Sequence, residues 1–514
     1  MSKTIIIIGA GLAGLSAALQ AAENGCNVKL VSSLPSERAQ SVMAEGGINA
    51  ALNTKDENDS PEEHFTDTIK AACGLADPNA VWGMTQAAPE LVHWLLKLGV
   101  KFNMSGYDDV DLRNFGGQKK KRTAFAQSDT GKQIMTAMID AVRRKEASGM
   151  VERFSHHSFL TLRLCGNICC GCVIRDEYSQ ETVELPGDAV IVATGGMHGL
   201  FGNTTGSLSN TGEVTAELFR LGVPLANGEM IQYHPTTVKC GGKRMLISEA
   251  ARGEGGRLFA LRNNQPWYFM EEKYPELGNL MPRDITAREI WKVSHESEVF
   301  LDMTEISEEI ISNKLSGLVD DCMTYLHKDI RKEPVSVLPG IHYFMGGILV
   351  DEQHRTPIQN LYAAGECCAQ YHGANRLGGN SLLGALYGGR VAAKSACEQA
   401  DVVDLSCATQ IDFPPASQIS EIKQLNKVMQ ETMGVVRNEN TLLNGIQTVQ
   451  ALTGNLPLLG MAVLKSALAR KESRGAHWRE DYPKSNDDDY LKTTVARFDG
   501  KQIQISFVPV PERR

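Results

Sequence analysis

The sequence contains no long apolar run, no excess of basic charge and few cysteines for its length. Its apolar segments are too short or too interrupted to cross a bilayer as a helix, so we expect no direct membrane span. The N-terminal apolar run contains Gly9, Gly11 and Gly14 and lacks the form of a signal peptide, which favours a cytoplasmic chain. The net charge of −9 argues against non-specific binding to nucleic acid or to an anionic membrane surface.

Twelve cysteines in 514 residues are too few for a disulfide scaffold. Four of them, Cys165, Cys169, Cys170 and Cys172, lie in an alternating apolar pattern around Gly166-Asn167, which predicts a hairpin. Because no second pair of ligands follows with zinc or ferredoxin spacing, we interpret them as buried or edge thiols and predict no metal site. The chain also has no iron–sulfur spacing and no haem motif of the Cys-x-x-Cys-His type.

A strand, a glycine-rich turn and a helix open the chain. The run 4–8 is an unbroken apolar strand, Gly9-Ala10-Gly11 and Gly14 follow it, and a second strand is predicted at 27–31. This context is typical of a dinucleotide site, in which the helix N-terminus receives the pyrophosphate. Ser32-Ser33 stands where an NAD site usually has an acidic residue, which weakens NAD and leaves FAD open.

Two later stretches predict a return to the same nucleotide fold, and a third predicts backbone close to a ligand. Gly46-Gly47 suggests backbone pressed against a flat ligand, 188–196 is a strand ending in Ala-Thr-Gly-Gly, and 361–366 is a strand ending at Glu366. The pattern is absent from about 228 to 343, which we interpret as an inserted domain. A length of 514 residues agrees with two to four domains.

The remaining chain is mostly helical by hydrophobic spacing. Ser60 is a predicted helix cap, and the basic run 119–122 is predicted to be a solvated surface. We predict helices over about 65–72, 81–98, 129–145, 382–396 and much of 417–471, one opening at 210–213, and a hairpin over 493–498 and 502–508.

Taken together, the ordered motifs resemble one family: the flavoprotein subunits of succinate dehydrogenase and fumarate reductase, with L-aspartate oxidase as a close relative. The resemblance covers nearly the whole chain. It rests on residues 9–14, 44–47, 193–196, 232–236, 248–255, 282–284, 342–347, 372–378 and 473–477.

The resemblance implies an α/β fold: a Rossmann-like FAD-binding domain with an inserted α+β capping domain, then a helical domain and a C-terminal region. The expected boundaries are 1–227 and 345–411 for FAD binding, 228–344 for the cap, 412–472 for the helices and 473–514 for the C-terminal region. It also implies FAD and chemistry on a C4 dicarboxylate such as fumarate or succinate. The residues expected to contact FAD are Gly9, Ala10, Gly11, Gly14, Ser32, Ser33, Gln40, Ser41, Ala44, Glu45, Gly46, Gly47, Ala193, Thr194, Gly195, Glu213, Glu366, Ser381 and Leu382.

A dicarboxylate needs two anion sites, for which arginine is well suited. We expect Arg376 with His342 to hold one carboxylate, and His234 with Ser248 to hold the other. A lone histidine is more often structural, but the matching motifs favour binding here.

By resemblance, Arg283 is the proton donor to fumarate, while a hydride arrives from the flavin. An arginine is a very weak acid, so it needs a relay that restores its proton at once. Glu249 and Arg252, three residues apart and on one helical face, resemble that relay. The alternative for this pair is a structural ion pair.

Two departures help to choose within the family, and two more mark differences near the pocket and the FAD. Gln40 stands where many respiratory members have the histidine that binds FAD covalently, so we expect non-covalent FAD and a preference for fumarate reduction. Phe115 replaces the glutamate with which L-aspartate oxidases meet the substrate ammonium. Phe344 is larger than the usual residue and could alter the pocket, and Glu213 stands in place of aspartate.

The leading hypothesis is an FAD-dependent fumarate reductase. Family resemblance implies an iron–sulfur electron-transfer subunit, docked partly through the C-terminal region and able to link the chain to a membrane. A stand-alone reductase is also open. The alternatives are L-aspartate oxidase, a reductase of another enoate, and an electron-transfer or assembly flavoprotein without its own substrate. The His234, Arg283, His342 and Arg376 set argues against the last.

Overall fold

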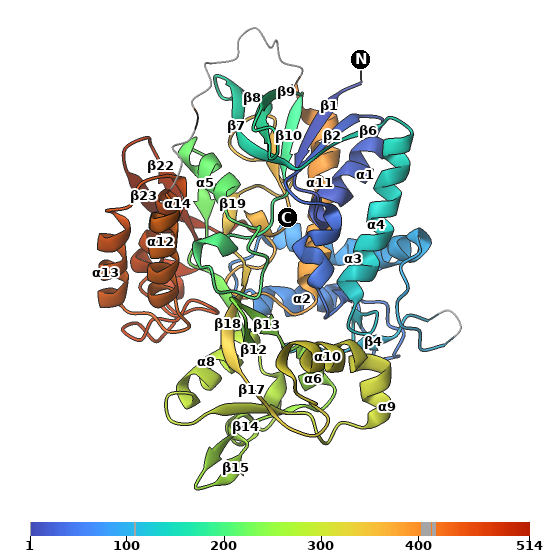
Figure 1. The fold of residues 1–514 in the computed structure, drawn as a ribbon, viewed down its shortest axis with the longest axis vertical. Helices are drawn as coiled ribbons and strands as arrows, with labels where there is room; N and C mark the ends of the chain where they lie inside the picture. The colour runs from blue at the N-terminus through green and yellow to red at the C-terminus, as the bar shows by residue number, and fades with distance from the viewer. Residues whose placement is uncertain (1, 107–108, 402–412, 414–417) are drawn as a thin grey trace.

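The computed structural model describes residues 2–106, 109–401, 413 and 418–514. In Figure 1 a parallel sheet with its helices lies at the upper right, the segment around β12–β18 forms the lower part, and the C-terminal helices lie at the left. The predicted fold class is confirmed: an α/β nucleotide-binding fold is interrupted by an insertion and followed by helices. The predicted domain boundary between residues 411 and 412 lies outside the described residues.

Five parallel strands form the central sheet in the order β20-β10-β1-β2-β6. Their bounds are β1 Thr4–Ile8, β2 Asn27–Ser32, β6 Val151–Ser155, β10 Ala189–Val192 and β20 Leu361–Ala363. Ile5 and Ile7 join the core beneath the helices on one face, and Ile6 and Ile8 join the core on the other. Burial of both faces explains why β1 reads as an unbroken apolar run.

Helices cover one face of this sheet and a small antiparallel sheet covers the other. The helices are α1 Leu12–Glu23, α4 Thr130–Ala147 and α11 Asn380–Gln399, and the second sheet contains β7 His157–Cys165, β8 Ile168–Asp176 and β9 Thr182–Pro186. The cysteine cluster therefore lies on the predicted hairpin, β7–β8. Cys169, Cys170 and Cys172 are buried, and burial raises the pKa of the Cys169 thiol to about 12.

The insertion has its own core, built from two antiparallel sheets and short helices. One sheet contains β12 Ile231–Cys240, β13 Lys243–Leu246 and β18 Leu338–Phe344; the other contains β14 Arg257–Arg262, β15 Gln265–Trp267, β16 Val299–Asp302 and β17 Val335–Ser336. The helices are α6 Glu249–Gly253, α7 Phe269–Lys273, α8 Arg283–Val293, α9 Glu308–Ile310 and α10 Ser316–Asp321.

The C-terminal hairpin extends a sheet that begins in the nucleotide-binding part of the chain. The order β21-β19-β11-β22-β23 joins β22 Lys492–Phe498 and β23 Ile503–Pro509 to β11 Leu225–Ala226, β19 Gly347–Leu349 and β21 Cys368–Ala369. The predicted hairpin is confirmed, and it is the outer edge of a composite sheet. Helices α12 Ile419–Thr432, α13 Glu439–Val449 and α14 Asn455–Ala469 lie nearby, and α15 Asp487–Tyr490 directly precedes β22.

The other elements are α2 Pro61–Ala71, α3 Pro78–Leu98, α5 Glu213–Arg220 and a small sheet of β3 Ile48–Asn49, β4 Leu112–Arg113 and β5 Thr123–Ala124. Ser60 caps α2 as predicted, because its hydroxyl accepts a hydrogen bond from Glu63 N.

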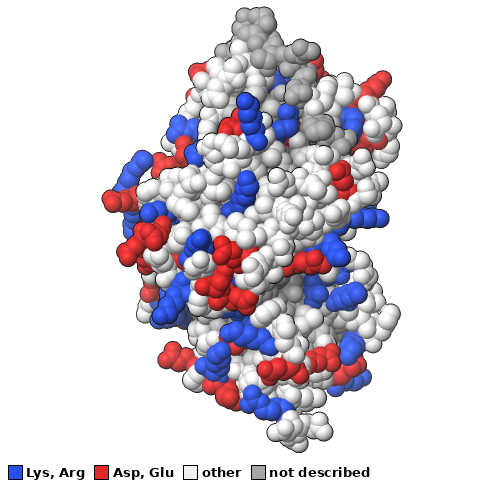
Figure 2. Space-filling model, turned by 90° about the vertical axis from the view of Figure 1, so that its left-hand side faces the viewer, with Lys and Arg blue, Asp and Glu red and all other residues white. Residues whose placement is uncertain are grey.

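The prediction of a solvated surface for 119–122 is wrong at Arg122. Arg122 is completely buried, and its Nη2 lies 2.9 Å from both Asp59 Oδ1 and Asp67 Oδ2. The two carboxylates come from the loop before α2 and from α2 itself, so the local basic pattern could not reveal this pairing. Over the face shown in Figure 2, acidic and basic side chains are interspersed.

Candidate active site

One cavity of about 1040 Å³ joins the carboxyl ends of the parallel strands to the insertion. It is lined by all the residues predicted to contact cofactor or substrate except Gly14, and also by Glu249 and Arg283. Arg252 does not line it. The tertiary structure therefore brings together residues as far apart in sequence as Gly9 and Leu382.

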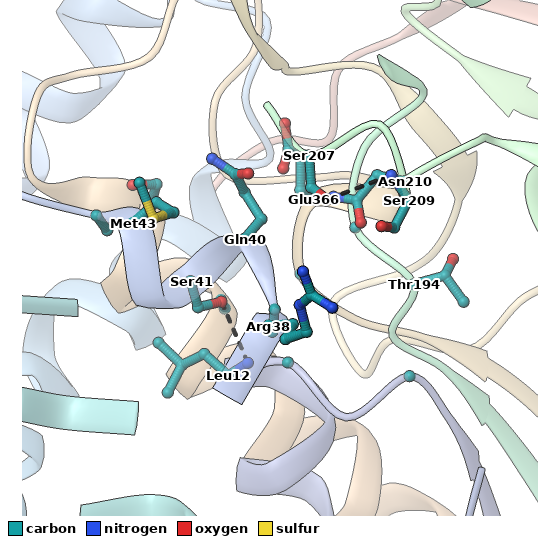
Figure 3. Close-up of a pocket in the computed structure, with 18 of the residues that line it drawn as sticks. Leu12, Arg38, Gln40, Ser41, Met43, Thr194, Ser207, Ser209, Asn210 and Glu366 are labelled. Atoms are coloured by element: carbon teal, nitrogen blue, oxygen red, sulfur yellow. Dashed lines mark hydrogen bonds between the residues drawn. The ribbon is translucent and has the colours of Figure 1, made fainter. Parts of the chain in front are cut away.

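The glycine-rich turn shapes one wall of this cavity. A Cβ on Gly11 would come no closer to the neighbouring groups than 3.7 Å, from Ser41 Oγ, so space is left open in front of the backbone. The Ser41 hydroxyl accepts a hydrogen bond from Leu12 N at 3.3 Å at the start of α1 (Figure 3). Gly14 does not line the cavity and packs against the turn: a Cβ there would lie 1.8 Å from Gly9 O. Its place is in helix–strand packing and not in direct contact with a ligand.

These features fit a dinucleotide. The open backbone lies at a helix N-terminus, where a pyrophosphate is favoured. Ser32 Oγ, at the end of β2, is a buried hydroxyl without a hydrogen-bond partner among the described residues, as a ribose-facing group would be in the absence of ligand. At 1040 Å³ the cavity exceeds the usual size of a small-molecule site.

Several lining residues escaped the sequence analysis. Figure 3 shows Arg38 extending into the cavity from the segment just before Gln40, with Ser207, Ser209 and Asn210 nearby. A cation two residues before Gln40 and soon after the second strand was a usable signal, because a pyrophosphate carries negative charge.

The other end of the cavity gathers buried charged groups from the insertion and from the returning chain. Arg283 Nε donates a hydrogen bond to Glu249 Oε2 at 2.8 Å. Arg283 Nη1 donates to Gln232 Oε1 at 3.1 Å, and Arg376 Nη2 donates to the same oxygen at 3.0 Å. Gln232 was quoted within a motif but not predicted as a site residue; its amide oxygen holds both guanidinium groups in place.

Glu249 is the buried acceptor of this cluster. Besides Arg283, its carboxylate accepts a hydrogen bond from Gly116 N at 2.9 Å and lies 3.6 Å from Arg252 Nη2. Burial raises the pKa of Glu249, but the charges of Arg283 and Arg252 and these hydrogen bonds outweigh it, and the pKa lies below its ordinary value. Glu249 is therefore a carboxylate at neutral pH, placed between two arginines.

Two histidines face each other beside these arginines, with ring centroids 5.2 Å apart. Burial and then the charge of Arg283 lower the pKa values of His234 and His342 well below the ordinary range, so both rings are neutral at pH 7. His342 Nδ1 is hydrogen-bonded to Thr205 Oγ1 at 2.8 Å, and His234 Nε2 is buried without a partner among the described residues. Burial also lowers the pKa of Arg376 to about 9.

The prediction that Phe344 alters the pocket is wrong. Phe344 is 1% exposed and does not line the cavity. Its ring packs against His198 and Phe201, at centroid distances of 5.0 and 5.7 Å, while its backbone N donates to Glu366 Oε1. Its side chain belongs to a hydrophobic core shared with Phe201 and does not reach the cavity. Phe115, by contrast, does line the cavity.

Comparison with known proteins agrees with this geometry. Residues 4–382 match the family described as FAD binding domain, and residues 452–513 match the one described as fumarate reductase flavoprotein C-term. The chain is 37% identical to the succinate dehydrogenase flavoprotein subunit of Bacillus subtilis, over 100% of this chain and 98% of that protein.

This chain belongs to the succinate dehydrogenase and fumarate reductase flavoprotein family. It is also 32% identical to the 8-methylmenaquinol:fumarate reductase flavoprotein subunit of Wolinella succinogenes, over 100% of this chain and 92% of that one. The E. coli quinol fumarate reductase FrdA structure superposes with a TM-score of 0.90 at 27% identity, over 99% and 97% of the two chains.

The predictions of FAD and of an oxidoreductase of the succinate dehydrogenase/fumarate reductase type, acting on a CH–CH bond, are thereby confirmed. The relatives are flavoprotein subunits, which supports subunit partners in general. Within the described residues, no helix of this family member has the length and apolar character needed to cross a membrane.

Proposed function

We propose that this flavoprotein reduces fumarate to succinate, with Arg283 as the proton donor. The observation that carries the proposal is the buried Arg283–Glu249 pair, which lies in the cavity wall together with Arg376 and two neutral histidines.

Two anion subsites follow from the arrangement. Arg376 and His342 would hold one carboxylate: Arg376 is restrained by Gln232, and its guanidinium carbon lies 4.1 Å from the centroid of the Tyr343 ring. His234 and Ser248 would hold the other, since His234 Nε2 has no protein partner among the described residues. An anion here would satisfy buried donors whose desolvation is otherwise uncompensated.

The acid must be an arginine that can give up a proton and recover it. Glu249 contacts Arg283 on one side and approaches Arg252 on the other, so a proton leaving the Arg283 guanidinium can be replaced through Glu249 from Arg252. Arg252 lies outside the cavity lining, as a relay group leading away from substrate should. Arg283 and Arg376 would also stabilise negative charge that develops on the substrate carboxylate.

FAD would lie along the other wall of the cavity, held by the glycine-rich turn, Ser41, Glu366 and the Ala193–Gly195 segment. When bound and reduced, FAD supplies a hydride at N5. We propose non-covalent binding because Gln40, which lines the cavity, has no imidazole to form the bond. By family resemblance, the covalent link raises the flavin potential, so a flavin without it favours reduction of fumarate over oxidation of succinate.

Phe115 favours a substrate without an ammonium group over L-aspartate, because its side chain lines the cavity and offers no charge. As a partner we propose an iron–sulfur electron-transfer subunit, in line with the flavoprotein subunits among the relatives. Through such a partner the chain would reach a membrane.

The test is flavin reoxidation. The purified holoenzyme is reduced without oxygen, fumarate is added, and the flavin absorbance is followed. We expect rapid reoxidation that falls by about 10²- to 10⁴-fold in Arg283→Ala, the range for losing a general acid. Lys292→Ala is the matched control: Lys292 lies on the same helix, α8, half-exposed and outside the cavity.

Wild-type flavin that stays reduced with fumarate would overturn the proposal. Oxidised enzyme should then be tested with L-aspartate, and reduced enzyme with other enoates. If Arg283→Ala raised KM but left the rate at saturating fumarate unchanged, Arg283 would bind the substrate and would not donate the proton.

A further inference from the structure

The fold itself shows where the adenosine half of FAD must lie. In a dinucleotide fold the pyrophosphate sits at the first helix, and the adenosine ribose lies beyond the end of the second strand. Here β6 pairs in parallel with β2, with Ser32 opposite Ser155. The residue that follows β6, His156, therefore lies next to Ser32-Ser33, at the adenosine end of the cavity.

Two aromatic side chains meet at this end. His156 comes from the turn between β6 and β7, and Tyr178 comes from the turn between β8 and β9. Both line the same cavity as the glycine-rich turn, and their ring centroids are 5.2 Å apart with an interplanar angle of 56°. Tyr178 is 78% exposed, so much of its ring is free to receive a ligand.

Hydrogen bonds to backbone N–H groups fix the two turns that carry these rings. Asp176 Oδ1 accepts hydrogen bonds from Tyr178 N at 2.7 Å and from Ser179 N at 2.9 Å, which fixes the turn. Glu177 N donates to His156 O at 2.8 Å and so ties the two turns together. His156 has a φ of 59°, a left-handed conformation that costs free energy in a residue with a side chain. The surrounding contacts maintain this strained conformation, which makes the His156 side chain a candidate for a functional role.

We propose that His156 and Tyr178 form the aromatic wall of the adenine subsite and so make the site selective for FAD over FMN. An aromatic surface suits a purine, because base–aromatic stacking is favourable whatever the hydrogen-bonding edge of the base. FMN has no adenine and would leave this wall uncovered. The inference rests on FAD as the cofactor and does not depend on which substrate is reduced.

The experiment compares ligands with and without adenine. The rate of FAD release is measured on holoenzyme by the fluorescence of the freed flavin. The full chain stripped of flavin is then titrated with FAD, ADP and FMN by calorimetry. In Tyr178→Ala we expect the Kd values for FAD and ADP to rise by about 5- to 150-fold, the effect of losing one stacked base. The Kd for FMN should change by less than about twofold.

Two variants separate the ring from the backbone. Tyr178→Phe keeps the ring and should bind FAD within about twofold of wild type. His156→Asn removes the aromatic ring but tolerates the left-handed conformation, so it should weaken FAD and ADP without refolding the turn. Unchanged FAD and ADP binding in both Tyr178→Ala and His156→Asn would overturn the proposal. Equal weakening of FMN and FAD would also overturn it, because the rings would then support the fold and not the base.

Discussion

At the scale of single residues, the site is defined by charges that burial has separated from water. Glu249 stays ionised because two arginines and a backbone N–H surround it, whereas His234 and His342 stay neutral because burial and the same arginine oppose their protonation. The same positive neighbour thus gives opposite charge states, because it stabilises the anionic form of a carboxyl and destabilises the cationic form of an imidazole.

Glu45 differs from Glu249 because its pKa is raised and not lowered, and this shift can be tested by measuring stability at different pH values. It lines the cavity, and burial, followed by the charge of Asp321, raises its pKa from 4.5 to about 8. Between pH 4.5 and about pH 8 the Glu45 carboxyl is protonated in the folded protein and ionised in the unfolded chain. The free energy of unfolding therefore falls as the pH rises through this range. Glu45→Gln cannot ionise. We expect the unfolding temperature of flavin-free wild type to fall more between pH 5 and pH 8.5 than that of Glu45→Gln.

The control for this comparison is Glu309→Gln, which changes an exposed carboxylate. It should keep the wild-type dependence on pH. Parallel curves for wild type and Glu45→Gln, measured by scanning calorimetry, would show that Glu45 is ionised at neutral pH in the folded protein.

At the scale of elements, the contact of α1 with β1 depends on the absence of one side chain. Because a Cβ on Gly14 would lie 1.8 Å from Gly9 O, Gly14→Ala must push α1 away from the glycine-rich turn. We expect overpacking to cost at least about 1–3 kcal/mol of stability and to reduce the FAD that is retained on purification. The flavin-to-protein absorbance ratio and the thermal unfolding midpoint measure both effects.

Gly434→Ala is the matched control, because its Cβ would come no closer than 3.6 Å to Val436 O. It should retain FAD at the wild-type ratio. If Gly14→Ala did so too, the close approach of α1 to β1 would not be required for cofactor binding.

At the scale of the whole molecule, the C-terminal hairpin closes a structure that begins near residue 225. Leu225 and Ala226 of β11 pair with Ala496 and Val495 of β22. The buried Arg470 donates to Glu229 Oε1 at 2.7 Å, and the Thr494 hydroxyl donates to the same carboxylate. Removal of β22 would leave an open strand edge and would take the Thr494 hydrogen bond from the buried Glu229 carboxylate, both of which are costly.

We therefore expect a chain ending at residue 491 to lose FAD and to aggregate, although none of the deleted residues lines the cavity. A chain ending at residue 510 should behave as wild type, because it lacks only exposed residues. Size-exclusion chromatography with flavin detection distinguishes the two. A monomeric, FAD-containing protein after truncation at 491 would show that the hairpin is an independent appendage.

The sequence by itself determined the elements whose cause is local. The β1–turn–α1–β2 unit, the Ser60 cap and the β7–β8 hairpin depend on apolar periodicity, on glycines and on caps within a few residues of one another. Ordered motifs likewise predicted one site containing Arg283, Glu249, Arg376 and the two histidines, and in the structure these residues line one cavity.

Only the tertiary structure decided what depends on distant neighbours. It buried Arg122 between two aspartates, turned Phe344 into a core away from the cavity, placed Gln232 between Arg283 and Arg376, and joined the C-terminal hairpin to β11. The physical reason is the same in each case: burial, charge pairing and strand-edge pairing are set by residues that are far apart along the chain and meet only when it folds.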